Sequence, residues 1–440
     1  MSVAARAADA GLYTAPASGA MAFAAGFVFS ARAVVVLLCV NVLGTDPRTG
    51  AEAGLILNLL LLVAVAFHSL GAAARSTSSI LCLPAVRWVS AFLALACCSL
   101  AWSATVSLPT SIAYWCGVAA DVAIVLILFR ARPVDETANS MLKGFVAASC
   151  ALALLAWIMP TQSDLRLGDE EFFNTNQIGN LCAFGILFAQ YLGRRTQGRW
   201  GSAIAFLSIT LLRSLSKTTI IALLLSEAFL VVQDRSMRRR TKVLLTVGAM
   251  LLILVFWGLF EAYYDVYTTA GNQAQTLTGR TGIWAYVLNE AIDKPWLGHG
   301  FDSMWKVIPP FGPDRFEARH AENELLQQFY TYGVAGLVIV AGLYGSLIRA
   351  IRRLPSGPVP MLLFTIVIFV LIRGLAEAEP FDLLLPCWAV VVLSLVVDDL
   401  APFRTQPSGA QQSGAQLPAS GPAAVASEQA FSAGVPIEQT

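Results

Sequence analysis

Apolar segments long enough to cross a lipid bilayer recur along most of this chain, and they constrain its fold more than any other feature. A transmembrane helix needs about 20 predominantly apolar residues, and the sequence offers about twelve such stretches. Hydrophobic residues make up 57% of the sequence and charged residues only 13%, which is too apolar for a soluble domain. We therefore predict an all-α, polytopic integral membrane protein with about twelve transmembrane helices and one large outer loop. The predicted spans lie near residues 21–44, 53–73, 84–103, 110–130, 140–160, 175–193, 199–214, 217–233, 243–262, 325–348, 358–376 and 380–397.

The Lys and Arg residues of the short loops predict the orientation of these spans. Cytoplasmic loops of membrane proteins carry an excess of Lys and Arg. When the N-terminus is placed in the cytoplasm, the loops on that side hold most of the basic residues, whereas the loops on the opposite side hold few. The largest cytoplasmic cluster is Arg235, Arg238, Arg239, Arg240 and Lys242. Both termini are therefore expected in the cytoplasm, and the loop at 263–324 is expected on the outer face.

The spans divide the chain into four parts. Residues 1–262 carry spans one to nine, 263–324 form the outer loop, 325–398 carry spans ten to twelve, and 399–440 form a cytoplasmic tail. The tail is rich in Ala, Ser, Gln, Pro and Gly, a composition typical of disorder. A net charge of +1 gives no general attraction for nucleic acid, so we expect the lipid bilayer and not nucleic acid as a partner.

The outer loop contains the pattern of an amphipathic helix from about Thr281 to Asp293. Apolar residues recur there at helical spacing and form one face suited to lying on the membrane surface. These residues are Ile283, Trp284, Val287, Leu288, Ala291 and Ile292. Pro295 ends the helix, and two glycines shape the turn that follows. Arg280 stands at the start of this helix, where a cation gains nothing from the helix dipole. It is either a functional cation or a solvated arginine at the interface.

Ionisable residues near the predicted outer surface are candidates for a site. His320 lies beside Arg319 and Glu322, and either His320 or Glu322 has the chemistry of a proton acceptor. The structural alternative for Glu322 is a place in the first turn of a helix beginning near Ala321, where an acidic residue is favoured. The same outer side holds Arg213 and Lys217, which either bind an anion or extend toward lipid phosphates. Two other histidines, His68 and His299, are interpreted as structural, and Asp121 within span four is either a buried hydrogen-bonded group or part of the site.

Several short motifs follow one another in a characteristic order between about residues 100 and 340. They are Trp102-Ser103, Asn176, Ser214-Leu-Ser216-Lys217-Thr218, Gly279-Arg280 to Trp284, the turn from Pro295 to Phe301, Glu322-Asn323, and Gly333-Val-Ala-Gly336. Together they resemble the O-antigen ligase and polysaccharide-polymerase family. The stretch at 214–218 is similar to the exopolysaccharide-polymerase branch of that family.

The resemblance implies an all-helical, twelve-span glycosyltransferase of the bacterial inner membrane with its catalytic loop in the periplasm. The implied donor is an undecaprenyl-diphosphate-linked oligosaccharide, and no cofactor or metal ion is implied. Arg280 matches the loop arginine that binds the diphosphate, and Lys217 stands where many members have arginine. Those members place the proposed catalytic histidine directly before the asparagine, whereas here Glu322 occupies that position and the histidine is His320. Further candidates for substrate binding are Arg213, Arg319, Asn323 and Asn176.

Three functions fit these observations. The first is a polymerase that joins repeat units of a surface polysaccharide, which the stretch at 214–218 slightly favours. The second is an O-antigen ligase that transfers the glycan to lipid A-core. A transporter or flippase is the third, but it would be expected to show repeats and ionisable groups at the membrane midplane. A non-enzymatic scaffold would leave the cluster of Arg, His and Glu unexplained.

Overall fold

A computed structural model describes residues 17–401 of the protein with several gaps. Residues 38, 40–42, 45–46, 71–76, 160–165, 169–172, 197, 234–237, 259–260, 262–276, 306 and 309–317 fall outside the described part, as do 1–16 and 402–440. Most of the predicted outer-loop residues before 277 and nearly all of the predicted tail therefore lie outside the described residues, and both stay predictions.

Each of the predicted spans contains a helix, and the described residues form helices without any β-strand. The first half of the chain forms α2 (Ala17–Leu37), α3 (Pro47–Ser69), α4 (Thr77–Leu81), α5 (Pro84–Ser99), α6 (Leu108–Ala131), α7 (Val134–Ile158) and α8 (Thr175–Thr196). The second half forms α9 (Gly201–Ser214), α10 (Lys217–Gln233), α11 (Arg239–Val255), α13 (Leu277–Asp293), α14 (Glu324–Arg352), α15 (Pro358–Arg373) and α16 (Cys387–Leu400).

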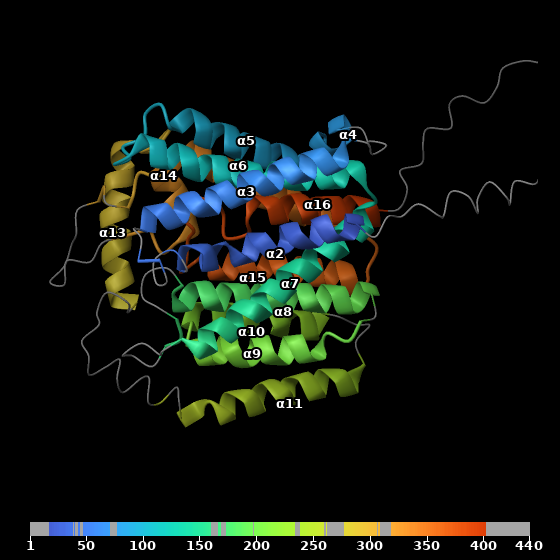
Figure 1. Ribbon diagram of the computed structural model, residues 1–440. Coiled ribbons are helices and arrows are strands. Elements are labelled where there is room, and N and C mark those ends of the chain that lie inside the picture. The colour runs from blue at the N-terminus through green and yellow to red at the C-terminus, as the bar shows by residue number, and fades with distance from the viewer. Residues whose placement is uncertain are drawn as a thin grey trace, which may run out of the picture. The chain divides into compact units, whose positions relative to one another are not determined.

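The long helices lie roughly along one common axis, and α13 crosses one end of this bundle nearly at right angles (Figure 1). Four of the described helices, namely α3, α6, α7 and α14, are individually long and apolar enough to cross a membrane. Shorter apolar helices, among them α5, α9 and α15, run beside them. The predicted all-helical, polytopic membrane architecture is therefore confirmed.

Small residues allow the central helices to pack closely. Helices α2 and α7 form the most extensive helix pair of the bundle. A Cβ atom on Gly26 would come within 1.9 Å of the carbonyl oxygen of Met141, and one on Gly144 within 2.0 Å of the carbonyl oxygen of Phe23. The two backbones thus touch directly, as small residues permit in membrane helices. This contact fixes α2 against α7 in the interior of the bundle.

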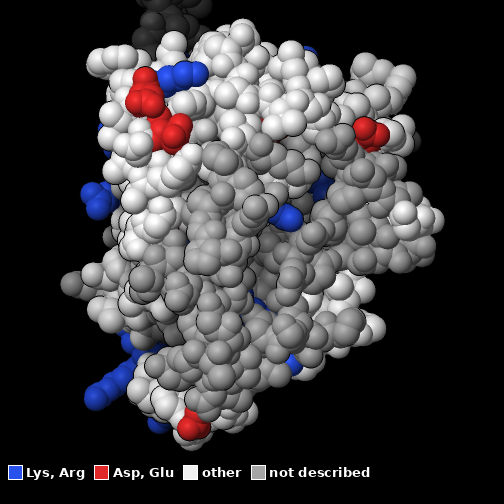
Figure 2. Space-filling view, turned by 90° about the vertical axis from the view of Figure 1, so that its left-hand side faces the viewer, with Lys and Arg blue, Asp and Glu red and all other residues white. Residues whose placement is uncertain are grey.

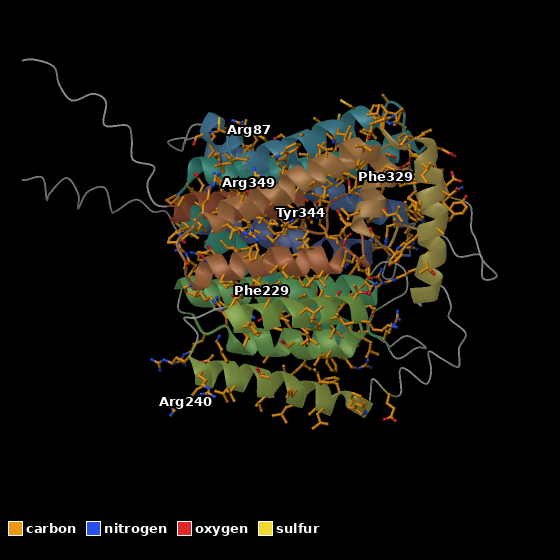
Figure 3. The ribbon with its side chains drawn as sticks, turned by 180° about the vertical axis from the view of Figure 1, so that it is seen from behind. Arg87, Phe229, Arg240, Phe329, Tyr344 and Arg349 are labelled. Atoms are coloured by element: carbon orange, nitrogen blue, oxygen red, sulfur yellow. The ribbon has the colours of Figure 1, made fainter. Side chains whose placement is uncertain are left out.

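Several basic residues gather at one end of the bundle. Arg87, Arg240 and Arg349 all lie toward the end remote from α13 (Figure 3). Arg194, Arg195 and Arg352 belong to last helical turns that end there as well. The α13 end also carries basic residues, among them Arg280 of α13 and Lys294 just after it. The basic residues of the remote end agree with the pattern from which the orientation was predicted, and the orientation itself stays a prediction.

Helix α13 agrees with the predicted amphipathic helix but begins four residues earlier, at Leu277. Its residues Ile283, Val287 and Ala291 are almost fully buried, in a cluster that includes Met304, Ile308, Ala321 and Tyr330. The outer side, with Leu288 and Ile292, remains exposed. Only part of the apolar face is therefore left to lie on the membrane surface, because its inner half packs against α14 and the loop before it.

A glycine-lined contact joins the turn after α13 to a kink inside α14. Gly333 adopts φ 61° and ψ −154°, a conformation outside the helical region and nearly exclusive to glycine. The backbone amide of the next residue, Val334, donates to the carbonyl oxygen of Pro295 at 2.8 Å. The amide of Gly300 donates to the carbonyl oxygen of Thr331 at 2.8 Å. A Cβ on Gly333 would lie 2.4 Å from the carbonyl carbon of Trp296. The motifs at 295–301 and 333–336 are thus two sides of one backbone contact.

The end of α5 completes this junction. Ser103 Oγ donates to the carbonyl oxygen of Phe301 at 2.5 Å, and Trp102 Nε1 donates to Leu297 O at 3.4 Å. The amide of Ala104 donates to His299 O at 3.0 Å. Three motifs that are far apart in the sequence therefore meet at one place, which holds α13 across the end of the bundle.

Replacing Gly333 with alanine is expected to destabilise the protein. The side chain would meet the backbone of Trp296, and the backbone angles suit only glycine, so we expect a loss of roughly 2–4 kcal/mol in the free energy of unfolding. The measurement is the Tm and the folded fraction of the detergent-solubilised protein. Gly345 lies in the same helix with no atom near its Cβ position, so Gly345→Ala is the matched control and should keep or raise the Tm. Equal melting of the two variants would contradict the proposed role of the contact.

Candidate functional site

Arg280 lies near the start of α13 and joins three parts of the chain. One guanidinium nitrogen, NH2, lies 3.1 Å from Glu322 Oε2 and 3.1 Å from Glu377 Oε1. The other, NH1, donates to Thr218 Oγ1 at 3.2 Å. The side chain of Arg280 is only 16% exposed, and that of Glu377 only 3%. The arginine that the sequence singled out is therefore the centre of a largely buried ionic cluster.

The spacing between Arg280 and Trp284 has a direct structural reason. Residues four apart lie on the same face of a helix, so both side chains reach the loop before α14. While Arg280 contacts the carboxylate of Glu322, Trp284 Nε1 donates to the carbonyl oxygen of the same residue at 3.2 Å. Glu322 itself has φ 52°, a conformation that is uncommon for residues other than glycine. Helix α13 thus holds Glu322 by its side chain and by its backbone.

The start of α14 lies against the end of α15. Glu324 N donates to the carbonyl oxygen of Gly374 at 2.9 Å, and Asn323 Nδ2 donates to Leu375 O at 2.9 Å. Asn323 also caps α14, because its Oδ1 accepts from Leu326 N at 3.0 Å. The structural alternative for Glu322, a place in the first turn of a helix beginning near Ala321, does not apply, since α14 begins at Glu324, one residue before the predicted span at 325–348. A role for Asn323 in substrate binding stays a prediction beside this observed capping role.

A second buried arginine, Arg373, lies next to this cluster. It is the last residue of α15, and its NH2 lies 4.0 Å from Glu377 Oε2. Its Nε donates to Thr219 Oγ1 at 3.3 Å. Neither Arg373 nor Glu377 was among the predicted site residues. Both are ionisable residues in a strongly apolar part of the sequence, which is a sign of function. Arg373 was instead assigned to the end of a span, and Glu377 to the short loop after it.

His320 lies on the other side of Glu322. Its Nδ1 is 3.8 Å from Glu322 Oε1 and accepts a hydrogen bond of 3.3 Å from the amide of Glu322. Burial raises the pKa of the Glu322 carboxyl above its ordinary value, although His320 and Arg280 act in the opposite direction. Arg319, the neighbouring candidate, places its guanidinium 5.3 Å from the centre of the Trp305 ring. The structure thus brings Arg280, Glu322 and His320 together.

The connection between α9 and α10 supplies hydroxyl groups to the same place. Ser216 Oγ donates to Asn176 Oδ1 of α8 at 3.0 Å, which links the two predicted residues at the starts of α8 and α10. Lys217 is the exposed first residue of α10, directly before Thr218, which accepts from Arg280. Arg213 lies in the last turn of α9. Lys217 and Arg213 are therefore close in sequence to Thr218, which contacts Arg280, and their roles in substrate binding stay predictions.

The remaining sequence candidates have structural contacts. Asp121 pairs with Arg32 at 2.5 Å and accepts from Asn58 at 2.6 Å, so it is a buried hydrogen-bonded group. His299 lies 3.0 Å from the carbonyl oxygen of Glu290 and stacks on Tyr330 with ring centres 4.4 Å apart. The structural interpretation of His299 is consistent with these contacts.

This arrangement suits the binding of an anion. Two guanidinium groups, of Arg280 and Arg373, share the carboxylate of Glu377, and hydroxyls of the α10 start complete their contacts. An anionic ligand can take the place of a carboxylate on Arg280, because a guanidinium binds carboxylate and phosphate oxygens with the same geometry. Figure 2 looks onto this end of the bundle, where basic side chains are visible near the middle of the face. A proton acceptor, His320 or Glu322, lies directly beside that position.

Comparison with known proteins extends this description. Residues 202–341 match the family model described as O-antigen ligase. The exopolysaccharide production protein ExoQ of Rhizobium meliloti (strain 1021) is 25% identical over 328 residues, which cover 66% of this chain and 72% of that protein. An O-antigen ligase of Pseudomonas aeruginosa is 26% identical over 180 residues, which cover 41% of each chain.

The matched segment contains Arg280, Trp284, His320, Glu322 and the kink at Gly333, whereas Arg373 and Glu377 follow it in the sequence. The motifs and the comparisons thus agree, and residues 202–341 of this polytopic membrane protein match the O-antigen ligase family model.

Proposed function

We propose that this protein transfers a glycan from an undecaprenyl-diphosphate carrier to a sugar hydroxyl on the periplasmic face of the bacterial inner membrane. The observation that carries the proposal is the ionic cluster around Arg280, where a guanidinium at the end of a membrane bundle meets two carboxylates, and one of these, Glu322, lies next to His320. The family match over 202–341 supports glycan transfer in surface-polysaccharide synthesis. The basic residues gathered at the opposite end of the bundle support a periplasmic position for the cluster.

The proposed reaction uses the cluster in one displacement. The acceptor hydroxyl oxygen attacks the anomeric carbon of the donor sugar, and the bond between that carbon and the diphosphate oxygen breaks. The diphosphate keeps the electron pair and stays on the polyprenol, while the hydroxyl proton moves to His320 or Glu322. Arg280, together with Lys217 and Arg213, stabilises the charge that develops on the diphosphate. Preorganised donors of this kind are worth about 10²–10³ in rate each.

Before the reaction, the diphosphate must replace a carboxylate on Arg280. Glu322 is the more accessible partner, because its side chain is 17% exposed and that of Glu377 is 3% exposed. Binding of the donor at Arg280 therefore releases Glu322 toward His320 while Glu377 keeps the guanidinium in place. Donor binding and activation of the proton acceptor are coupled through this exchange.

A polymerase is the form of this reaction that we favour, and an O-antigen ligase is the alternative. ExoQ, named as an exopolysaccharide production protein, aligns with more of this chain than the O-antigen ligase does. Deletion of the gene, followed by sizing of surface polysaccharide and lipopolysaccharide, tests the proposal. Loss of long polymer with normal capping of the lipid core indicates a polymerase, and uncapped core with accumulated lipid-linked glycan indicates a ligase. Normal amounts of both products would refute glycan transfer.

The proposed transfer needs no metal ion. Diphosphate is a good leaving group when cationic side chains neutralise its charge, and Arg280 is placed to do so. Treatment of the purified protein with EDTA is therefore expected to leave the rate of glycan transfer unchanged. The assay measures formation of product from lipid-linked donor in vesicles. Complete loss of activity that Mg²⁺ or Mn²⁺ restores would show that the charge is neutralised by a metal ion instead.

A further inference from the structure

A cavity lies beside the segment that carries Glu377. It has a volume of about 430 Å³ and lies between α2, α3, α6 and the residues 379–382 that lead into α16. Glu377, which holds Arg280, and Glu379, which lines the cavity, are two residues apart, so their Cα atoms lie within about 7.6 Å of each other. One short segment therefore contributes both to the ionic cluster and to the cavity.

The lining of this cavity combines aromatic rings with carboxylates. Tyr114 and Phe381 stack with ring centres 4.0 Å apart, and both contribute to the wall. Four acidic residues and one arginine complete the charged part of the lining; they are Glu52, Asp121, Glu379, Asp382 and Arg32. Arg32 is already paired with Asp121 at 2.5 Å. The cavity therefore has an excess of negative charge that no lining cation balances.

This lining suits a sugar better than a phosphate. Carboxylates accept hydrogen bonds from sugar hydroxyls, and aromatic rings pack against the apolar C–H faces of sugar rings. A phosphate group, by contrast, would be repelled by the like charges of Glu52 and Glu379. Pockets of roughly 300–1,000 Å³ accommodate small organic ligands, so the volume is sufficient for a short stretch of glycan.

We propose that the cavity between α2, α3, α6 and residues 379–382 binds the non-phosphorylated sugar end of the acceptor glycan. The inference rests on the proposed glycan transfer and adds to it the class of acceptor, because an anionic cavity favours a neutral repeat unit over a phosphorylated lipid core. The acceptor then approaches the reaction from the position of Glu379, while the diphosphate is held at Arg280. The segment that carries Glu377 and Glu379 thus contributes to both binding positions.

The first test measures binding without catalysis. Calorimetry with the full-length protein uses oligosaccharide fragments of the cell's own surface polysaccharide, freed of lipid and phosphate. Glu379→Gln removes one charged acceptor, and Ala113→Phe fills part of the cavity from α6. Each is expected to weaken binding by about tenfold, as the loss of one good hydrogen bond or contact does. The control Glu136→Gln changes an exposed glutamate in the first turn of α7, remote from the cavity, and should bind like the wild type.

The second test separates this inference from the proposed function. With saturating lipid-linked donor in vesicles, Glu379→Gln and Ala113→Phe are expected to raise the KM for the acceptor about tenfold and to leave the KM for the donor unchanged. If the wild-type protein transfers glycan and both variants keep its acceptor binding and its KM for the acceptor, the cavity is not the acceptor site. The proposed function is unaffected by that outcome. Equally tight binding of a phosphorylated core oligosaccharide would overturn its charge selectivity. If the wild-type protein transfers no glycan but binds the fragments through this cavity, the proposed function fails and the binding site stands.

Discussion

Replacing Arg280 with alanine is expected to abolish glycan transfer while the protein still inserts into the membrane. Arg280 is the residue that contacts both Glu322 and Glu377 at 3.1 Å, and it is the cation placed to meet the diphosphate. Removal of one preorganised donor costs about 10²–10³ in rate, and loss of the charge that holds Glu322 in place adds to this. Initial rates of product formation from lipid-linked donor, with the variant reconstituted in vesicles, measure the effect.

Stability has to be controlled in this experiment, because Arg280→Ala leaves the nearly buried carboxylate of Glu377 with fewer partners. An uncompensated buried charge is strongly destabilising. The double variant Arg280→Ala/Glu377→Gln restores the charge balance and is expected to fold normally but to remain inactive. Lys294→Ala changes an exposed basic residue just after α13 and should keep full activity. A folded Arg280→Ala protein with near-wild-type product would show that Arg280 does not serve the diphosphate.

Arg280→Lys refines the same prediction. Lysine keeps the charge but lacks the planar fork with which Arg280 contacts Glu377 and Thr218 at the same time. We expect partial activity, with a larger effect on the KM for the donor than Lys294→Ala produces. Full activity of this variant would indicate that charge alone is required.

The fold was predictable from sequence because hydrophobicity is a local property. The spans assigned to 217–233 and 358–376 contain α10 and α15 almost residue for residue, since each apolar run is bounded by charged or turn-forming residues. A bilayer leaves helices as the only way for such runs to satisfy their backbone groups. Helix boundaries were less accurate where no charged or turn-forming residue marks them, as at the start of α13, which lies at Leu277 and not at Thr281.

The site was predictable only in part because its contacts connect distant segments. Arg280, Glu322 and His320 share one loop, so the sequence placed them together, and the structure does the same. Arg373 and Glu377 follow a different helix, and no periodicity indicates that α15 ends beside α13. Their position beside Arg280 depends on how α14 and α15 pack, through the hydrogen bond from Glu324 N to Gly374 O. Tertiary packing of this kind is not encoded in a single segment.

The segment at 374–382 also explains why residues outside the matched family segment belong to the site. It contacts Arg280 through Glu377, and it lines the cavity through Glu379 and Phe381. Asp382 fixes its far end by accepting from the amides of Leu383 and Cys387 at the start of α16.

Separate replacement of His320 and Glu322 is expected to identify His320 as the group that removes the proton. Donor binding releases Glu322 from Arg280, so both groups are then available to accept the proton. An imidazole, with an ordinary pKa of about 6.5, is a stronger base than a carboxylate, with an ordinary pKa of about 4.3. We therefore expect His320→Gln to lower the rate by about 10²–10⁴, as loss of a general base does. Glu322→Gln should lower it less, because glutamine still fills the place between Arg280 and His320. His68→Gln, at an exposed position of the opposite end, is the control and should be fully active.

The pH dependence of the variants decides between the two groups. A carboxylate base works only when deprotonated, so its activity falls as the pH drops through its pKa. The charge of His320 lowers the pKa of Glu322, and burial raises it. If Glu322 were the base, His320→Gln would stay active and the acid limb of its rate profile would move to higher pH, because the lowering effect of the His320 charge on the pKa of Glu322 is removed. If His320 is the base, the same variant loses its activity at every pH, and Glu322→Gln keeps an acid limb. Equal and small losses in both variants would mean that neither side chain removes the proton, and that water or the acceptor itself carries it away.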